Sequence, residues 1–262
     1  MKTLLFCLVS CSAILALSMN VEAIRNDSDL ILYYSFDEDD DKEVADDSGN
    51  GFDAEVAGAD WSKEGKLGGA MEFDGAKSAV KSPPEVPGLT DTELTAMTVE
   101  HWVMINAGTG GVQQVWEALN AAGAWPAETF IEGTADMVFY IYDTKNKEHR
   151  TPIPVLPTKK WVHIAGTYDG KVQKSYLNGK VVGEEAWSGK ISIFAAPTGA
   201  IVLGKDNEAD IQYLNGFIDE FAFYTRALSE DEINADMNDG VLFAVDPREK
   251  LSTTWANIKA EY

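Results

Sequence analysis

The chain has 262 residues, of which 45% are apolar and 10% aromatic. Lysine and arginine total 21 against 43 aspartate and glutamate residues, so the formal net charge at pH 7 is −22. Such a surface repels phosphate, which argues against nucleic-acid binding and against adhesion to an anionic membrane. The apolar content excludes a disordered chain, and the length suits one large sandwich or barrel or two small domains.

The first 23 residues have the pattern of a cleavable secretory signal peptide. Lys2 supplies a positive charge, residues 3–19 are mostly apolar, and small residues precede the expected cut at Val21 and Ala23. The mature chain would begin at Ile24, and we expect it to be secreted, either extracellular or periplasmic. No later stretch approaches the roughly 20 apolar residues of a transmembrane helix, so no membrane insertion of the mature chain is expected.

Cys7 and Cys11 are the only cysteines, and both lie in the signal segment. The mature protein is therefore expected to lack thiols and disulfides, which excludes thiol nucleophiles and zinc–thiolate sites. The sequence around Cys11 resembles a bacterial lipobox. Cleavage there would leave a very short apolar region and strand residues 13–17 behind it, so a lipid anchor at Cys11 is disfavoured.

Short apolar runs separated by turn dipeptides predict an all-β, antiparallel sandwich. Residues 97–105 are apolar on both faces and are expected to form a central strand. Asn178-Gly179 predicts a type I′ hairpin, and nothing alternates with long helices as a parallel sheet would require. The expected strands cover residues 30–36, 71–73, 79–80, 97–105, 137–142, 161–168, 172–177, 180–183, 200–203 and 217–224.

One short helix near the C-terminus is indicated by a capping box. Ser229 fits its N-cap, Glu232 fits the third helical position, and Gly240 fits the stop. Residues 241–262 then form a tail. Apolar residues at helical spacing around Trp255 favour a short amphipathic helix there.

Three stretches, in this order, resemble the laminin G-like jelly-roll domain of the concanavalin A-like lectin/glucanase superfamily. Residues 34–75 contain YSFDE, DDSGNG and LGGAMEFDG; residues 161–179 contain WVHIAGTYDG and YLNG; residues 216–233 contain GFIDEFAFY and RALSEDEI. The resemblance implies one concanavalin A-like domain over residues 24–240, with two curved antiparallel sheets and adjacent N- and C-terminal strands. Residues 107–132 fit the family pattern poorly.

A calcium site is suggested by an oxygen-rich loop. Asp46, Ser48 and Asn50 alternate before Gly51, as in the first half of a calcium-binding loop. Asp219 lies in an otherwise apolar strand, where a carboxylate is costly unless paired or coordinated. Similar domains hold a structural Ca²⁺ between such a loop and the terminal strand, so the resemblance implies Asp46, Asn50 and Asp219 as ligands. The alternative is that the loop residues make Asx turns and that Asp219 caps a loop amide.

Catalysis is not expected, because no nucleophile elbow or nucleotide-binding glycine pattern occurs and no carboxylate pair of a retaining glycosidase is visible. Asp219 and Glu220 are adjacent in one strand and should face opposite ways. His163 is expected to be a packed residue. We therefore expect no catalytic residues and a binding module instead.

Glycans or cell-surface proteins are the expected partners, with exposed aromatic side chains as contacts. Trp125, Trp187 and Tyr213 lie near predicted turns or before the terminal strand and are the candidates. Two alternatives stay open: a secreted glycoside hydrolase or polysaccharide lyase of the same fold, and a structural or envelope-attachment protein that uses the tail.

Overall fold

The computed structural model describes residues 27–39, 42–107, 111–118, 126–132, 136–194, 200–206 and 209–242. These residues form sixteen strands and one helix. The expected signal peptide, Trp125 and nearly all of the tail lie outside them. No helix among the described residues is long and apolar enough to cross a membrane.

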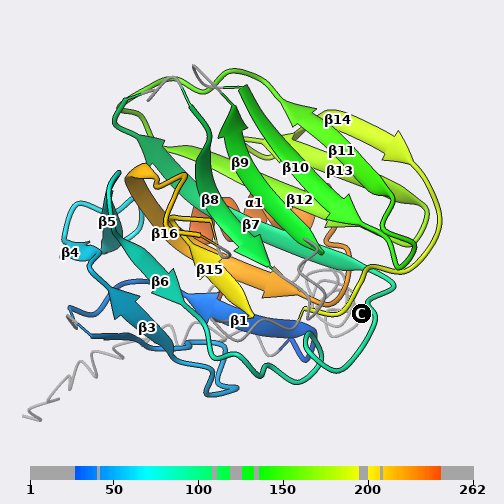
Figure 1. Ribbon diagram of the computed structural model, residues 1–262, viewed down its shortest axis with the longest axis horizontal. Coiled ribbons are helices and arrows are strands. Elements are labelled where there is room, and N and C mark those ends of the chain that lie inside the picture. The colour runs from blue at the N-terminus through cyan, green and yellow to red at the C-terminus, as the bar shows by residue number, and fades with distance from the viewer. Residues whose placement is uncertain are drawn as a thin grey trace, which may run out of the picture.

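Two antiparallel sheets of eight strands each lie face to face (Figure 1). Sheet I has the strand order β14-β13-β12-β7-β16-β5-β4, and β1 also pairs with β16. Its strands are β1 (Leu30–Tyr34), β4 (Asp60–Ser62), β5 (Ala70–Asp74), β7 (Met97–Ile105), β12 (Val162–Tyr168), β13 (Val172–Leu177), β14 (Lys180–Ala186) and β16 (Asn215–Tyr224).

Sheet II faces the viewer in Figure 1 and has the order β11-β10-β9-β8-β15-β6-β3-β2. Its strands are β2 (Glu43–Val44), β3 (Ala54–Ala57), β6 (Ala79–Lys81), β8 (Gln113–Ala118), β9 (Ala127–Glu132), β10 (Asp136–Tyr142), β11 (Glu148–Ile153) and β15 (Ile201–Leu203). The predicted antiparallel sandwich is confirmed. The strands β2, β3, β4, β8, β9 and β11 were not among those predicted.

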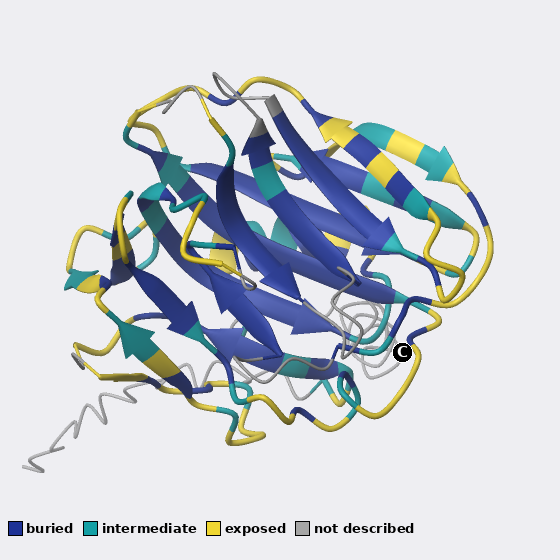
Figure 2. Ribbon diagram, viewed as in Figure 1, coloured by how far each residue is buried: buried dark blue, intermediate teal, exposed yellow. Residues whose placement is uncertain are grey.

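The core fills the space between the two sheets, and it requires close approach at Gly166. This glycine lies in β12 of sheet I, and a Cβ added to it would stand 2.5 Å from the ring of Phe139 in sheet II. Phe139 and Phe221 are completely buried in the same cluster. Figure 2 shows the central strands of both sheets as buried, whereas the edge strands β11 and β14 include exposed positions.

The predicted hairpin and helix are both confirmed. Asn178 and Gly179 have φ angles of 50° and 75°, as a type I′ turn requires. The helix α1 (Glu230–Asp239) begins with a complete capping box between Ser229 and Glu232.

α1 covers part of the outer face of sheet I, where a second apolar cluster lies. Ile233 of the helix packs there with Tyr33, Ala222 and Tyr224, and the Tyr224 hydroxyl donates to Asp236 at 2.8 Å. The helix thus covers the part of the outer face of sheet I that is formed by β1, β16 and their neighbours.

Candidate functional site

A pocket of about 240 Å³ lies on the outer face of sheet II. Its lining comes mainly from four neighbouring strands, β8 to β11, and from the segment that follows β15. The lining residues are Val112, Gln114, Glu117, Glu128, Phe130, Tyr140, Tyr142, Glu148, Asp206 and Gln212.

Strand alternation explains why these side chains share one face. Phe139 of β10 is buried in the core, so its neighbour Tyr140 and then Tyr142 face outward. In β9 the outward positions are Glu128 and Phe130. The core residues between them therefore fix the direction of the pocket residues.

Strand β8 reaches the same face through a bulge. Its register with β9 shifts between Gln114 and Trp116, and both Val115 and Trp116 lie in the core. Two consecutive inward residues thus separate the outward residues Gln114 and Glu117. As a result, Glu117 lies directly opposite Glu128 in the β8–β9 ladder.

Glu128 is a buried acid held by a neutral donor. Its exposed fraction is 8%, and its Oε2 accepts from Gln114 Nε2 at 2.8 Å. Burial raises the pKa of Glu128 to about 7; the negative charges of Asp206 and Glu148 add to this rise, while the hydrogen bond from Gln114 opposes it. Near neutral pH the carboxyl group is therefore protonated in part of the molecules and ionised in the rest.

Three ring side chains form an aromatic row beside this acid: Phe130, Tyr140 and Tyr142. The ring centroids of Phe130 and Tyr140 are 5.1 Å apart with an interplanar angle of 20°, and those of Tyr140 and Tyr142 are 6.4 Å apart. The Arg150 guanidinium lies 4.6 Å from the Tyr140 ring centroid, and Arg150 also pairs with Glu148. Tyr140 is buried, so Phe130 and Tyr142, both half-buried, offer the accessible rings.

None of the pocket residues was predicted as functional. The strands β8 and β9 both lie in the stretch 107–132, which fits the family pattern poorly. The E-T-F-I-E run at residues 128–132 does not alternate apolar and polar residues, so periodicity gave no clear signal of a strand. The opposed acids could not be found from spacing, because residues 117 and 128 meet only through strand pairing.

The predicted calcium loop is held by hydrogen bonds between its side chains and the backbone. Asp46 Oδ1 accepts from the amides of Tyr33 and Ser48, and Oδ2 accepts from Phe52. Asn50 donates its side-chain amide to the Leu30 carbonyl at 2.9 Å. These contacts include the Asx turn of the alternative interpretation, and calcium binding by this loop stays a prediction.

Asp219 and Glu220 lie on the same face, and the prediction that they face opposite ways is wrong. The β16–β7 register shifts between Asp219 and Ala222, and Glu220 has a φ of 54°. Ile218 and Phe221 both point into the core, so the two acids lie together on the outer face between them. This bulge could not be read from alternation alone.

Asp219 is completely buried and only half satisfied. Its Oδ2 accepts from the amides of Lys66 and Leu67 at 2.7 and 2.9 Å, whereas Oδ1 has no hydrogen-bond partner in the part of the chain that the structure describes. Burial raises the pKa of Asp219 to about 8, and the charge of Glu220 adds to the rise. The pKa of Glu220 is raised to about 7, again mainly by burial.

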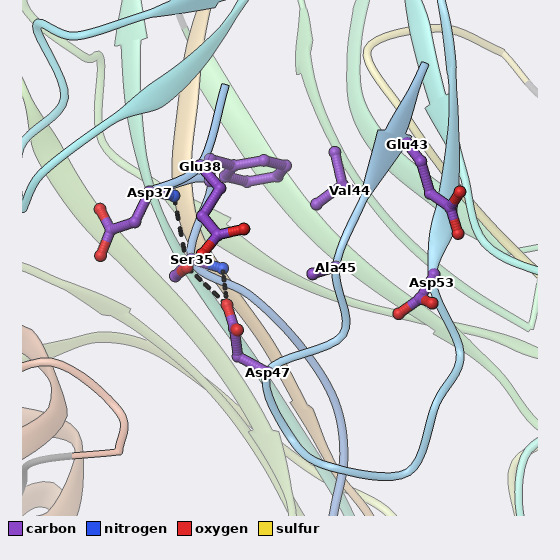
Figure 3. Close-up of a pocket in the computed structure, with 9 residues that line it drawn as sticks. Ser35, Asp37, Glu38, Glu43, Val44, Ala45, Asp47 and Asp53 are labelled. Atoms are coloured by element: carbon purple, nitrogen blue, oxygen red, sulfur yellow. Dashed lines mark hydrogen bonds between the residues drawn. The ribbon is translucent and has the colours of Figure 1, made fainter. Parts of the chain in front are cut away.

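An acidic pocket of about 140 Å³ adjoins this pair (Figure 3). Asp47 accepts from the Ser35 hydroxyl at 2.5 Å, while Asp37 accepts from the Gly69 amide at 2.9 Å. The charges of Asp37 and Asp47 both raise the pKa of Glu220. The five acids that line this pocket are Asp37, Glu38, Glu43, Asp47 and Asp53.

The three predicted aromatic contacts, Trp125, Trp187 and Tyr213, lie outside the lining of the pocket of sheet II or outside the described residues. Trp187 is 8% exposed and stacks between His149 and Tyr168 at centroid distances of 3.9 and 3.8 Å, so the expectation that it is exposed is wrong. Tyr213 is half-buried and does not line the pocket, although its neighbour Gln212 does. Trp125 lies outside the described residues.

His163 is a packed residue, as predicted. It is 2% exposed, its Nε2 lies 3.6 Å from Glu100 Oε2, and its ring meets Trp102 edge-on at 5.3 Å. Burial lowers the pKa of His163 to about 3, so the ring is neutral at physiological pH.

Two stacked antiparallel sheets, with a capping helix on one outer face and a pocket on the other, define a lectin-like β-sandwich. A family model described as the concanavalin A-like lectin/glucanases superfamily (Laminin_G_3) matches residues 74–234. The chain belongs to this family, as its sequence pattern indicated.

Solved structures share the fold at low sequence identity. Domain 4 of AbnA, a GH43 extracellular arabinanase from Geobacillus stearothermophilus in complex with arabinotriose, aligns with a TM-score of 0.61 at 20% identity, covering 79% of this chain and 97% of that one. The botulinum neurotoxin serotype G binding domain aligns with a TM-score of 0.64 at 16% identity, covering 79% and 50%.

Among curated proteins, the chain is similar to pappalysin-1 of Mus musculus, with 32% identity over 113 residues, which is 42% of this chain. Human pappalysin-1 matches at 31% over 114 residues. The chain spans about 7% of the length of these relatives.

The buried acids make stability depend on pH. Asp219 is uncharged in both states below about pH 4; between about pH 4 and 8 the unfolded chain loses this proton while the folded chain keeps it. We therefore expect the melting temperature in EDTA to fall from pH 5 to pH 8. Asp219→Asn should raise it at pH 8 by several degrees and reduce the fall.

Asp91→Asn is the control for this measurement, because Asp91 is exposed and its pKa is lowered by the Gly88 amide. It should leave the pH dependence above pH 5 unchanged. An Asp219→Asn variant that melts with the same pH profile as the parent chain would contradict the assignment of a buried neutral acid.

Proposed function

We propose that this protein is a secreted, non-catalytic binding module that holds a carbohydrate on the outer face of sheet II. The observation that carries the proposal is the pocket in which half-buried aromatic rings adjoin carboxyl and amide side chains. Sugar rings pack their C–H faces on aromatic rings and give their hydroxyls to such polar groups. The concave shape favours a glycan over a flat protein surface.

The comparisons support a binding role without specifying the ligand. The AbnA domain is described in complex with arabinotriose, and the botulinum domains are described as binding or receptor-binding domains. Both likenesses concern the fold, and ligands do not follow from a fold. Secretion is part of the proposal and rests on the signal-like N-terminal sequence. Attachment through the tail around Trp255 stays a prediction.

Removing an accessible ring should weaken glycan binding. We expect Phe130→Ala to lower the affinity for a glycan identified by array screening by about tenfold or more, since a buried aromatic contact is worth 1–3 kcal/mol or so. The matched control is Phe217→Ala, because Phe217 is half-buried on sheet I and contacts Trp161 there. Equal affinity of the two variants, measured by calorimetry, would place the ligand elsewhere.

A glycoside hydrolase is the second candidate, and the opposed acids favour it. Directly paired residues on one face have Cβ atoms about 4.5–5.5 Å apart, which suits the carboxyl spacing of about 5–5.5 Å in retaining glycosidases. Glu128, with its raised pKa, would protonate the leaving oxygen, and Glu117 would attack the sugar. Burial weighs against this function, because Glu117 and Glu128 are only 1% and 8% exposed and a polymer backbone must reach both.

Turnover of a polysaccharide panel tests the second candidate. If the protein is a hydrolase, Glu117→Gln and Glu128→Gln should each reduce the rate by about a hundredfold or more. Glu184→Gln, on the exposed edge strand β14, should leave it unchanged. Failure of the parent chain to release reducing ends from any member of the panel would exclude this candidate.

We also propose a structural calcium ion beside β16. The support is the unpartnered, buried Oδ1 of Asp219 together with the neighbouring charges of Glu220 and Asp37. We leave Asp46 out of this proposed site, because both of its carboxylate oxygens accept from backbone amides. The side-chain oxygen of Asn50 stays a candidate ligand, since only its amide nitrogen donates to the backbone. No three acidic, histidine or cysteine side chains among the described residues converge as a metal cluster, so carbonyl and water oxygens must complete the coordination.

Thermal melting with Ca²⁺ and with EDTA tests whether Asp219 binds the ion and whether Asp46 has only a structural role. A ligand bound only by the folded state at a hundred times its Kd adds about 2.7 kcal/mol of stability, so Ca²⁺ should raise the melting temperature by several degrees. Asp219→Asn should abolish that rise. Asp46→Ala should lower the melting temperature equally with and without Ca²⁺, because it removes amide caps. No response of the parent chain to Ca²⁺ would refute the ion.

A further inference from the structure

Among the described residues, those that line the pocket of sheet II include four carboxyl groups and no basic side chain. Glu148 is matched by Arg150, which bonds its Oε1 through Nε at 2.6 Å, and it also accepts from the Tyr142 hydroxyl at 2.9 Å. The positive charge of Arg150 is therefore already paired with Glu148 at the edge of the pocket. A ligand in this pocket meets an excess of negative charge.

Glu128 is the acid that most clearly needs a cation. Its Oε2 has the Gln114 amide as donor, and its Oε1 makes no hydrogen bond among the described residues. The residue is more than nine-tenths buried and lines the pocket. A carboxylate in such surroundings gains much more from a positive donor than it would in water, because little solvent screens the pair.

The described groups around Glu128 are polar, aromatic or acidic. Gln114 and Glu117 face it from β8, Tyr140 from β10, Glu148 from β11 and Asp206 from the segment after β15. Two of these carboxylates, Glu148 and Asp206, push its pKa upward, and no basic group lowers it.

A bound metal ion is not favoured as the missing charge. Among the described residues no three acidic, histidine or cysteine side chains converge as a metal cluster. Glu128 also differs from Asp219, because it borders a pocket large enough for an organic group. The half-buried rings of Phe130 and Tyr142 beside the acid also suit an organic ligand, since ring faces attract both sugar C–H groups and cations.

We propose that the pocket recognises an amino sugar with a free ammonium group, placing the ammonium on Glu128 and the pyranose ring against the aromatic row. This inference rests on the proposed carbohydrate-binding function and names its ligand class. An ammonium that projects from the ring reaches a recessed carboxylate that the glycosidic oxygens of a polymer do not reach. Binding therefore requires Glu128 to be ionised and drives its proton into solution.

Calorimetry with three tetrasaccharides tests the proposal: one of glucosamine, one of N-acetylglucosamine and one of glucose, at pH 6.0 and 150 mM salt, which screens the long-range attraction of an acidic protein. We expect the glucosamine oligomer to bind about tenfold or more tightly than the other two. Repeating the titration in buffers of different ionisation enthalpy should show release of about one proton, because the pKa of Glu128 starts near 7.

Glu128→Gln should reduce the affinity for the glucosamine oligomer about tenfold or more and abolish the proton release, with little effect on the neutral oligomers. Gln is close in shape to the protonated acid, so the fold should be retained, which the melting temperature checks. Glu184→Gln removes the same charge from the exposed edge of sheet I and should change neither readout.

The outcomes separate this inference from the proposed function. If the neutral and the N-acetylated oligomers bind as tightly as the amine, the carbohydrate-binding function stands and the ammonium site is refuted. If a lysine oligomer binds more tightly than the amino sugar, the partner is a basic peptide and the inference is overturned. If no oligosaccharide binds at all, both proposals fail.

Discussion

The shared core between the two sheets is the constraint on which the rest of this structure depends. Every second side chain of a central strand must point into that core. The side chains between them then point to an outer face. The contact between Gly166 and the Phe139 ring shows how closely the sheets approach, since not even a methyl group fits between them. Function is therefore left to the outer faces, and the helix α1 already covers part of one of these.

Two of the bulges in these sheets modify this rule and bring acidic side chains together. In β8 a bulge turns two consecutive residues, Val115 and Trp116, into the core and aligns Glu117 with Glu128. In β16 the bulge does the opposite and turns two consecutive residues, Asp219 and Glu220, away from the core. Bulges are common next to functional sites because they redirect side chains without interrupting a sheet. Here each bulge creates a pair of close carboxyl groups in a chain of high negative charge.

Features that depend only on residues close together in the sequence could be predicted. The type I′ turn at Asn178-Gly179 and the capping box at Ser229 depend on neighbouring residues alone, and both form as predicted. The family pattern added the pairing of the N-terminal strand with β16, which no local rule contains. The pocket could not be predicted, because Glu117, Glu128 and Tyr140 meet across three strands whose register is set by tertiary packing. The opposite orientation expected for Asp219 and Glu220 failed for the same reason, since a regular strand was assumed where one residue is inserted.

The acid pair Asp219–Glu220 and the pair Glu117–Glu128 differ in which cation can reach them. The difference follows from the groups that surround each pair. Asp219 is closed off by the backbone of Lys66 and Leu67, so only a proton or a small bare ion can reach its free oxygen. Glu128 borders an open pocket beside aromatic rings, so a larger organic cation can reach it. A buried carboxylate must be protonated, paired or coordinated. The same requirement therefore favours a structural role for the pair in β16 and a ligand-binding role for the pair formed by β8 and β9.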